Sequence, residues 1–184
     1  MTENKMIPFH FDPIELNNMG VQSLEHENYD FASDLLALAV RLIVKTSNID
    51  DNHSQQHRLQ SKYNTFRWSV STPQEKKESD LSIGTFTFSR GMFINVRKRH
   101  TVCNLSSDMK AAIAYNTGLS FHLLATENND STLLIKAGKM YRLSQSILRE
   151  SIKKGNPMSK LCLNYFFHVV LLNNLGQLSY ELVD

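Results

Sequence analysis

The sequence is poor in the residues that mark several classes of protein. Its 184 residues include only 2 cysteines, 7 glycines and 4 prolines. Cys103 and Cys162 are too few for a disulfide framework, and so little glycine and proline excludes an architecture made mainly of turns. An excess of one charge is also lacking, because 20 Lys and Arg residues balance 18 Asp and Glu residues. With a net charge of +2, bulk electrostatics indicate neither a nucleic acid nor a membrane surface as partner.

Long hydrophobic runs are missing too. The N-terminal stretch Met1–Asp12 has no apolar core of the kind found in secretory signals. The longest apolar stretches, Leu35–Val44 and Phe166–Leu172, fall far short of the ~20 residues that a membrane span needs. We therefore expect no membrane partner and an intracellular, cytoplasmic protein with reduced cysteines. The composition, 41% hydrophobic and 21% charged, is typical of a globular chain, here a single domain over residues 1–184.

Motifs of catalytic and cofactor sites are absent as well. The sequence contains no GxGxxG, no P-loop pattern, no GxSxG and no HExxH. We therefore expect a protein that is not an enzyme and that holds no cofactor and no metal. His53 and His57 have the spacing of a chelating pair on a helix, but no acidic or cysteine partner completes a recognisable ligand set.

What the sequence does contain is apolar periodicity of the helical kind, in two blocks. Residues 13–45 predict a first helix hairpin, with Asp12 as cap before Pro13 and a break at Asn28. Residues 107–184 predict a second hairpin and a terminal helix. The three helices expected there are Met109–Thr126, Thr132–Lys154 and Met158–Leu182. The predicted fold class is therefore all-α, a stack of antiparallel helix hairpins.

The stretch between the two blocks, residues 46–106, has a different character. It is polar over most of its length and poor in aliphatic residues, which predicts a flexible insertion. Phe86, Phe88 and Phe93 alternate around Gly91. This period of two predicts a short extended segment or hairpin near residues 83–96.

A five-residue stretch recurs along the chain. LNNMG at residues 16–20 returns as LNNLG at 172–176, and a looser copy, AYNTG, occupies 114–118. After Gly20 and again after Gly118, small and large residues follow along the chain in the same order. The pattern resembles the tetratricopeptide repeat, which runs Leu-Gly-x-x-Tyr in its first helix and Ala-x-x-x-Phe in its second. The positions that carry the resemblance are Gly20, Tyr29, Ala32, Leu36, Ala39, Gly118, Ala137, Tyr141 and Gly176.

The resemblance implies stacked hairpins, in which Gly20 and Gly118 let the second helix approach the first closely. One hairpin cannot bury its own apolar face, so stacking is obligatory. The spacing departs from the family, since the glycines are 98 and 58 residues apart whereas the usual period is about 34. Seven extra positions also separate Gly118 from Ala137. The chain thus resembles a divergent or fragmentary member.

The recurring asparagine is the sharpest functional feature. Asn18, Asn116 and Asn174 stand two residues before each glycine, where the resemblance implies a helix lining a concave groove and an amide bound to the main chain of an extended peptide. An amide suits that task because it offers both a donor and an acceptor. The alternative is that these amides cap neighbouring helices or face water. The residues expected to shape side-chain pockets beside them are Tyr115, Leu119, His122 and Tyr180.

The function expected from this resemblance is non-catalytic recognition of a protein or peptide, as an adaptor or scaffold. A clamp for a terminal carboxylate is disfavoured, because the candidate groove positions hold no Lys or Arg. One alternative is a helical repeat that contacts nucleic acid through the basic cluster Arg97–Arg99. Another is a small enzyme with an unrecognised His or Cys site. The identity of the partner and the oligomeric state do not follow from the sequence.

Overall fold

The computed structural model describes residues 12–50, 67–70, 90–95, 105–153 and 161–183. Within these ranges the fold is all-α, as predicted, with five helices and one pair of short strands. The helices are α1 (Pro13–Glu25), α2 (Tyr29–Asp50), α3 (Ser107–Asn128), α4 (Ser131–Lys153) and α5 (Leu161–Glu181). The strands are β1 (Arg67–Val70) and β2 (Met92–Asn95).

The helix ends have local chemical causes. The carboxylate of Asp12 accepts a hydrogen bond of 2.9 Å from the Ile14 N–H, which confirms the predicted cap before Pro13. In α3 the cap is Ser106, whose hydroxyl accepts from the Met109 N–H, so the helix begins at Ser107, two residues before the predicted Met109. Asn129 ends α3 in the left-handed conformation, with φ of 52°, a geometry that asparagine tolerates better than most residues.

The central stretch differs from the prediction at its start. α2 was predicted to end at Lys45 but continues to Asp50, because no proline or glycine stops it there. The extended segment predicted near residues 83–96 is present as β2, which pairs antiparallel with β1 in the register Val70↔Met92 to Arg67↔Asn95. The remainder of that segment before Arg90 lies outside the described residues.

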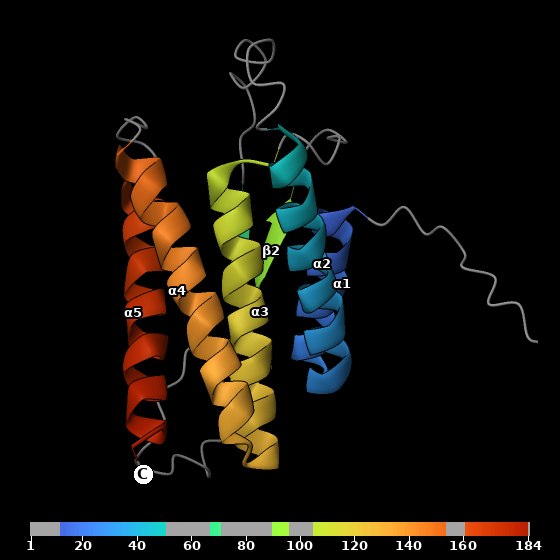
Figure 1. Ribbon diagram of the computed structural model, residues 1–184, viewed down its shortest axis with the longest axis vertical. Coiled ribbons are helices and arrows are strands. Elements are labelled where there is room, and N and C mark those ends of the chain that lie inside the picture. The colour runs from blue at the N-terminus through green and yellow to red at the C-terminus, as the bar shows by residue number, and fades with distance from the viewer. Residues whose placement is uncertain (1–11, 51–66, 71–89, 96–104, 154–160, 184) are drawn as a thin grey trace, which may run out of the picture.

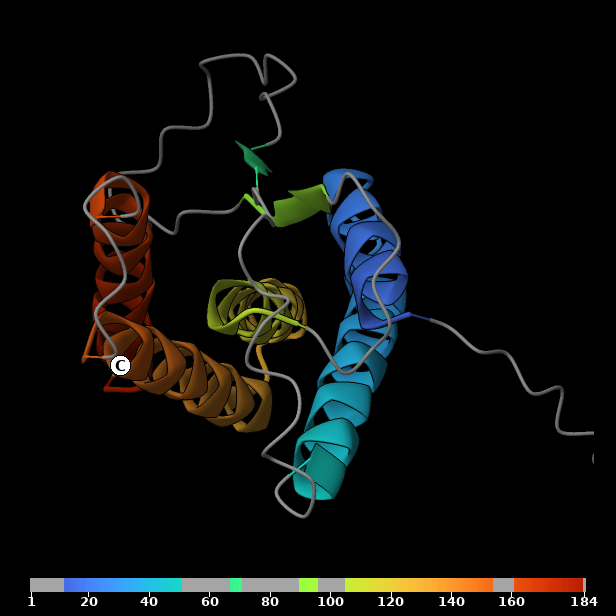
Figure 2. The same cartoon turned by 90° about the horizontal axis from the view of Figure 1, so that it is seen from above.

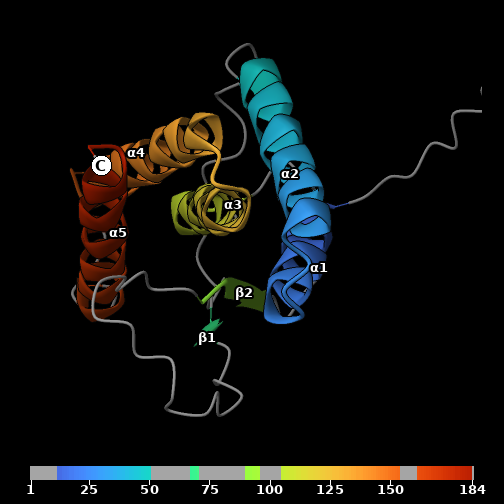
Figure 3. The ribbon, with the colours of Figure 1, turned by 90° about the horizontal axis from the view of Figure 1, so that it is seen from below.

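The helices are arranged around α3. Figures 2 and 3 show α3 at the centre, with α1 and α2 on one side and α4 and α5 on the other. The strand pair lies on the side of α3 that α1 and α5 border (Figure 3), and β2, labelled in Figure 1, contacts both α1 and α3. The two hairpins contact each other through α2 and α3. None of the helices, within the described ranges, has the length and apolar character needed to cross a membrane.

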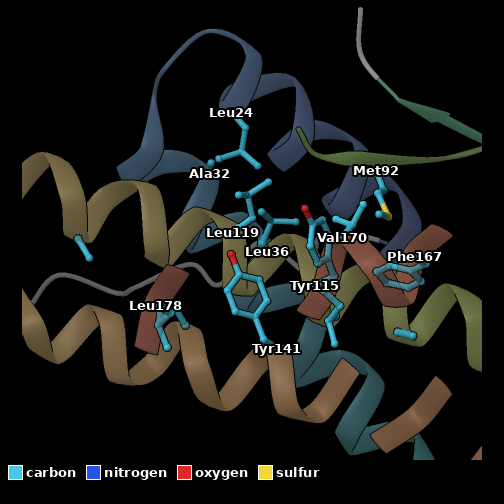
Figure 4. Close-up of a cluster of buried hydrophobic side chains, with 14 of the residues drawn as sticks. Leu24, Ala32, Leu36, Met92, Tyr115, Leu119, Tyr141, Phe167, Val170 and Leu178 are labelled. Atoms are coloured by element: carbon cyan, nitrogen blue, oxygen red, sulfur yellow. The ribbon is translucent and has the colours of Figure 1, made fainter. Parts of the chain in front are cut away.

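Two of the recurring glycines explain the close packing inside the hairpins. A Cβ on Gly20 would lie 2.5 Å from Leu36 Cγ, and one on Gly118 would lie 2.7 Å from Tyr141 Cδ1. Leu36 and Tyr141 therefore sit directly on the neighbouring helix. Both are fully buried in one apolar cluster that draws on all five helices and β2 (Figure 4). The third glycine, Gly176 in α5, has no such neighbour within 4 Å.

The other positions of the repeat are packed in the same way. Ala32, Ala39 and Ala137 are fully buried, while Tyr29 is partly buried against the same cluster. The extra residues between Gly118 and Ala137 lengthen the helices, because α3 continues to Asn128 and α4 already begins at Ser131.

Candidate peptide-binding site

Two of the recurring asparagines bind the main chain of an extended segment, and that segment is β2. Asn116 Nδ2 donates to the Met92 carbonyl at 2.8 Å, and the Met92 N–H donates to Asn116 Oδ1 at 2.8 Å. Asn18 repeats the arrangement two residues further along, with both hydrogen bonds to the main chain of Ile94 at 2.9 Å. Each side-chain amide thus pairs with one residue of β2 as a neighbouring strand would.

A third asparagine joins these two into one network. Asn17 Nδ2 donates to the Met92 carbonyl at 3.2 Å and to Asn18 Oδ1 at 3.1 Å. Asn17 Oδ1 accepts from Asn116 Nδ2 at 2.8 Å. Asn17 and Asn116 are fully buried, so these hydrogen bonds are shielded from competing water. We call the set Asn17, Asn18 and Asn116 the asparagine ladder.

The ladder and β1 hold opposite edges of β2. In a strand, the main-chain polar groups of alternate residues point to the same edge, about 6.6–6.8 Å apart. The groups of Met92 and Ile94 point to the ladder on α1 and α3, whereas β1 lies along the other edge. β2 is therefore an inner strand whose second neighbour is built from side chains.

The side chains of β2 are also fixed by the helices. Met92 is 2% exposed and Ile94 is 1% exposed, each within an apolar cluster. Gly91 is buried directly before the strand, and a Cβ at that position would lie 2.7 Å from Val21 Cγ1. Phe93, between the two anchors, is only partly buried. The site therefore combines main-chain hydrogen bonds with two buried apolar positions, those of Met92 and Ile94, and one position, that of Gly91, where a Cβ would overlap Val21.

Asn174 has a different environment from its two counterparts. It is buried in α5, and its Nδ2 donates to the hydroxyls of Tyr115 and Tyr141 at 3.3 Å each. Burial raises the pKa of both tyrosines far above the usual value, an effect that the hydrogen bond from Asn174 partly offsets. The Tyr115 hydroxyl also donates to the Arg90 carbonyl at 3.5 Å. Asn174 is thus linked to the segment before β2 through Tyr115.

The remaining predicted pocket residues, which are His122, Leu119 and Tyr180, lie in three different environments. His122 is buried, with Nδ1 3.3 Å from the Tyr141 hydroxyl and Nε2 2.7 Å from Glu181 Oε2. Both ring nitrogens are therefore engaged, and the group links α3 to α5. Leu119 is fully buried in the large apolar cluster, whereas Tyr180 on α5 is 62% exposed. The pocket role predicted for these side chains stays a prediction.

The structure therefore joins Asn18 and Asn116 in one site and adds Asn17, which the sequence did not single out as a ligand-binding residue. The doublet of asparagines that precedes both Gly20 and Gly176 was the available signal. Glu181 was also missed, and no motif marks it. The basic cluster Arg97–Arg99 and the pair His53 and His57 lie outside the described residues. In the part of the chain that the structure describes, no three His, Cys, Asp or Glu side chains group as a metal site would require.

Comparisons with protein-family models, with curated proteins and with solved structures found no match for this chain. The resemblance to tetratricopeptide repeats therefore stays a prediction that depends on the residues of this chain alone.

Proposed function

We propose that this chain is a non-catalytic protein-recognition module of the tetratricopeptide kind, which binds an extended peptide segment through the asparagine ladder. The single observation that supports the proposal is the pairing of Asn18 and Asn116 with the main chain of Ile94 and Met92. Side chains at corresponding positions of α1 and α3 present an amide to alternate residues of one extended segment. The same geometry suits any peptide that follows this path.

Recognition through main-chain groups has a clear chemical consequence. An amide that pairs with N–H and C=O groups does not discriminate between side chains, so the ladder supplies affinity and register. Selectivity for particular side chains then comes from the apolar positions that receive alternate residues of the peptide, as in other modes of strand recognition. The helices are already packed against one another, so the receptor loses little conformational entropy on binding.

Selection of peptides against the full chain tests this function. We expect a library of random dodecapeptides, selected against the full chain with Gly91→Ala so that β2 competes less for the ladder, to contain binders whose affinity, measured by calorimetry, falls by about tenfold or more when Asn18→Ala and Asn116→Ala are added, since each lost amide pair contributes about 1 kcal/mol. Asn128→Ala is the matched control, because Asn128 is exposed at the far end of α3. The proposal is wrong if affinity for every selected peptide stays within about 0.5 kcal/mol in the ladder variant.

The proposed partner is a protein segment, and neither a cofactor nor a metal takes part. Binding by the ladder involves uncharged amides, so we expect its affinity to change little between low and physiological salt. A steep loss of affinity with salt would instead indicate contacts to phosphates, as in the alternative that uses Arg97–Arg99. The intracellular location remains a proposal on the same footing.

A further inference from the structure

We infer that β2 is a built-in ligand of the asparagine ladder, and that its chemistry describes the partner. That partner is an extended segment of another protein with a glycine, a large apolar residue, a variable residue and a second large apolar residue. It binds where β2 now lies, after β2 has moved away. This inference rests on the proposed function and adds to it both the class of partner and the step that controls access.

The first argument concerns the occupied hydrogen-bonding groups. The Oδ1 and Nδ2 atoms of Asn18 and Asn116 all bond to β2, and the Asn17 amide bonds to β2 and to both of its neighbours in the ladder. An incoming main chain needs these same atoms. It therefore competes with β2 and cannot bind beside it.

The second argument concerns the side chains that β2 presents. Gly91 lies where a Cβ would meet Val21 at 2.7 Å, so the position before the anchors accepts glycine only. Met92 and Ile94 are almost fully buried, which makes the first and third positions of the strand apolar. Phe93 is partly buried, and a residue between two anchors points to the opposite face of the strand. These four positions define the proposed partner.

The third argument concerns how β2 is attached. Ile94 is 76 residues from Asn18 in sequence, and Met92 is 24 residues from Asn116. The contacts between strand and helices are thus non-local, whereas the helix–helix packing of α1 with α2 and of α3 with α4 is not mediated by β2. Because the helices keep these contacts with one another, β2 can leave while they stay packed, at the cost of exposing Met92 and Ile94, which is a local opening. The apparent affinity for the partner is then the intrinsic affinity multiplied by the fraction of open molecules.

Replacement of one glycine by alanine tests both the proposed residue pattern of the partner and the release of β2. The replacement should strengthen peptide binding when it is made in the protein and weaken it when it is made in the peptide. Gly91→Ala in the full chain pushes β2 away from Val21 and raises the open fraction. We expect the fluorescent peptide SRGMFINVR, which carries the sequence of residues 89–97, to bind this variant at least about tenfold more tightly than the wild type. The same peptide with alanine in place of its glycine should bind the opened variant at least about tenfold more weakly.

Matched variants make the result specific. In the opened background, Asn116→Ala should remove binding of the peptide, whereas Asn128→Ala should leave it unchanged. A peptide with aspartate at both apolar anchors should not bind. If Gly91→Ala fails to unfold cooperatively by circular dichroism, Ile94→Ala serves as the second opened variant, because it removes an anchor of β2 and leaves the helices intact.

Several outcomes overturn the inference. One is a folded opened variant that binds the peptide no better than the wild type does. Another is binding that Asn116→Ala leaves intact. The third is a stable dimer in analytical ultracentrifugation that Asn116→Ala abolishes, because the strand of a second copy would then be the occupant. If dodecapeptides from the library bind through Asn18 and Asn116 while SRGMFINVR does not, this inference fails and the proposed function stands. If no peptide binds through the ladder, both fail.

Discussion

At the scale of single residues, asparagine is the side chain that most resembles a peptide group. Its amide carries one carbonyl and one N–H₂ at fixed geometry, so a single asparagine satisfies both polar groups of a residue in a strand. Asn116 does so for Met92, and Asn18 does so for Ile94. In a buried site this matters, because an unpaired main-chain group costs about 1–3 kcal/mol.

Removal of one ladder amide gives the first prediction. Asn116→Ala leaves the N–H of Met92 without its partner, leaves Asn17 as the remaining side-chain donor to the Met92 C=O, and removes a hydrogen bond from Asn17. We expect the free energy of opening at β2 to fall by about 2–4 kcal/mol. Native-state hydrogen exchange at the Met92 amide measures this directly. Asn128→Ala should leave that exchange rate unchanged, and equal protection of Met92 in both variants would contradict the prediction.

The two buried tyrosines predict a loss of stability at alkaline pH. Burial raises the pKa of Tyr115 and of Tyr141 far above the usual value of about 10, so the folded chain keeps both phenols protonated where the unfolded chain ionises them. Their contribution is fully present below pH ~10 and is lost as pH rises further, because the folded state then binds more protons. Each tyrosine should lower the free energy of unfolding by about 1 kcal/mol per pH unit above that point.

Urea denaturation between pH 9 and 11.5 measures this effect. Tyr141→Phe should flatten the fall in stability above pH 10, although it also removes hydrogen bonds to Asn174 and His122. Tyr180→Phe is the control, because that side chain is largely exposed on α5. If the free energy of unfolding falls equally steeply above pH 10 in Tyr141→Phe and in the wild type, the buried Tyr141 phenol does not cause the loss of stability.

At the scale of elements, the helices could be predicted from sequence and the ladder only in part. Apolar periodicity and the cap at Asp12 are local signals, and they located the first hairpin and the start of α3 closely. The end of α2 was missed, because its last turn is polar and carries no stop signal. The amide of Asn18 was expected to bind an extended main chain. That this chain is β2, 76 residues away, depends on tertiary packing that no local pattern encodes.

The recurring glycines give a prediction about helix packing, in which replacement by alanine has different effects at the three equivalent positions. Alanine normally stabilises a helix by about 1 kcal/mol relative to glycine. At Gly20 and Gly118 the added Cβ would overlap Leu36 and Tyr141 at 2.5 and 2.7 Å, so we expect Gly20→Ala and Gly118→Ala to cost about 1–3 kcal/mol net. Gly176→Ala meets nothing within 4 Å and should be neutral or stabilising by up to about 1 kcal/mol.

Thermal and urea unfolding of the three glycine variants provide the measurement. Because all three replacements are chemically identical and lie within helices, differences between them report the neighbouring helix alone. If alanine changes the free energy of unfolding equally at Gly20, Gly118 and Gly176, close contact with the following helix is not the reason that glycine occupies these positions.

At the scale of the whole molecule, β2 connects two apolar clusters. Met92 belongs to the large cluster that reaches all five helices, and Ile94 belongs to a second cluster built from α1, α2 and the start of α3. Helix packing alone already joins α3 to both of its neighbours, α2 and α4. The strand therefore adds to the core without being the only link between its parts, which makes its separate release physically reasonable.

This arrangement predicts an order of unfolding. The sole tryptophan, Trp68, lies in β1 opposite Ile94, so its fluorescence follows the strand pair, whereas circular dichroism at 222 nm follows the five helices. We expect the fluorescence transition in urea to precede the helical transition, because the hydrogen bonds that anchor β2 to the helices come from three asparagines. Asn116→Ala should shift the fluorescence midpoint further toward low urea than the helical midpoint. Coincident transitions in both proteins would mean that the strand and the helices form one inseparable cooperative unit, and a partner could then not replace β2 without unfolding the chain.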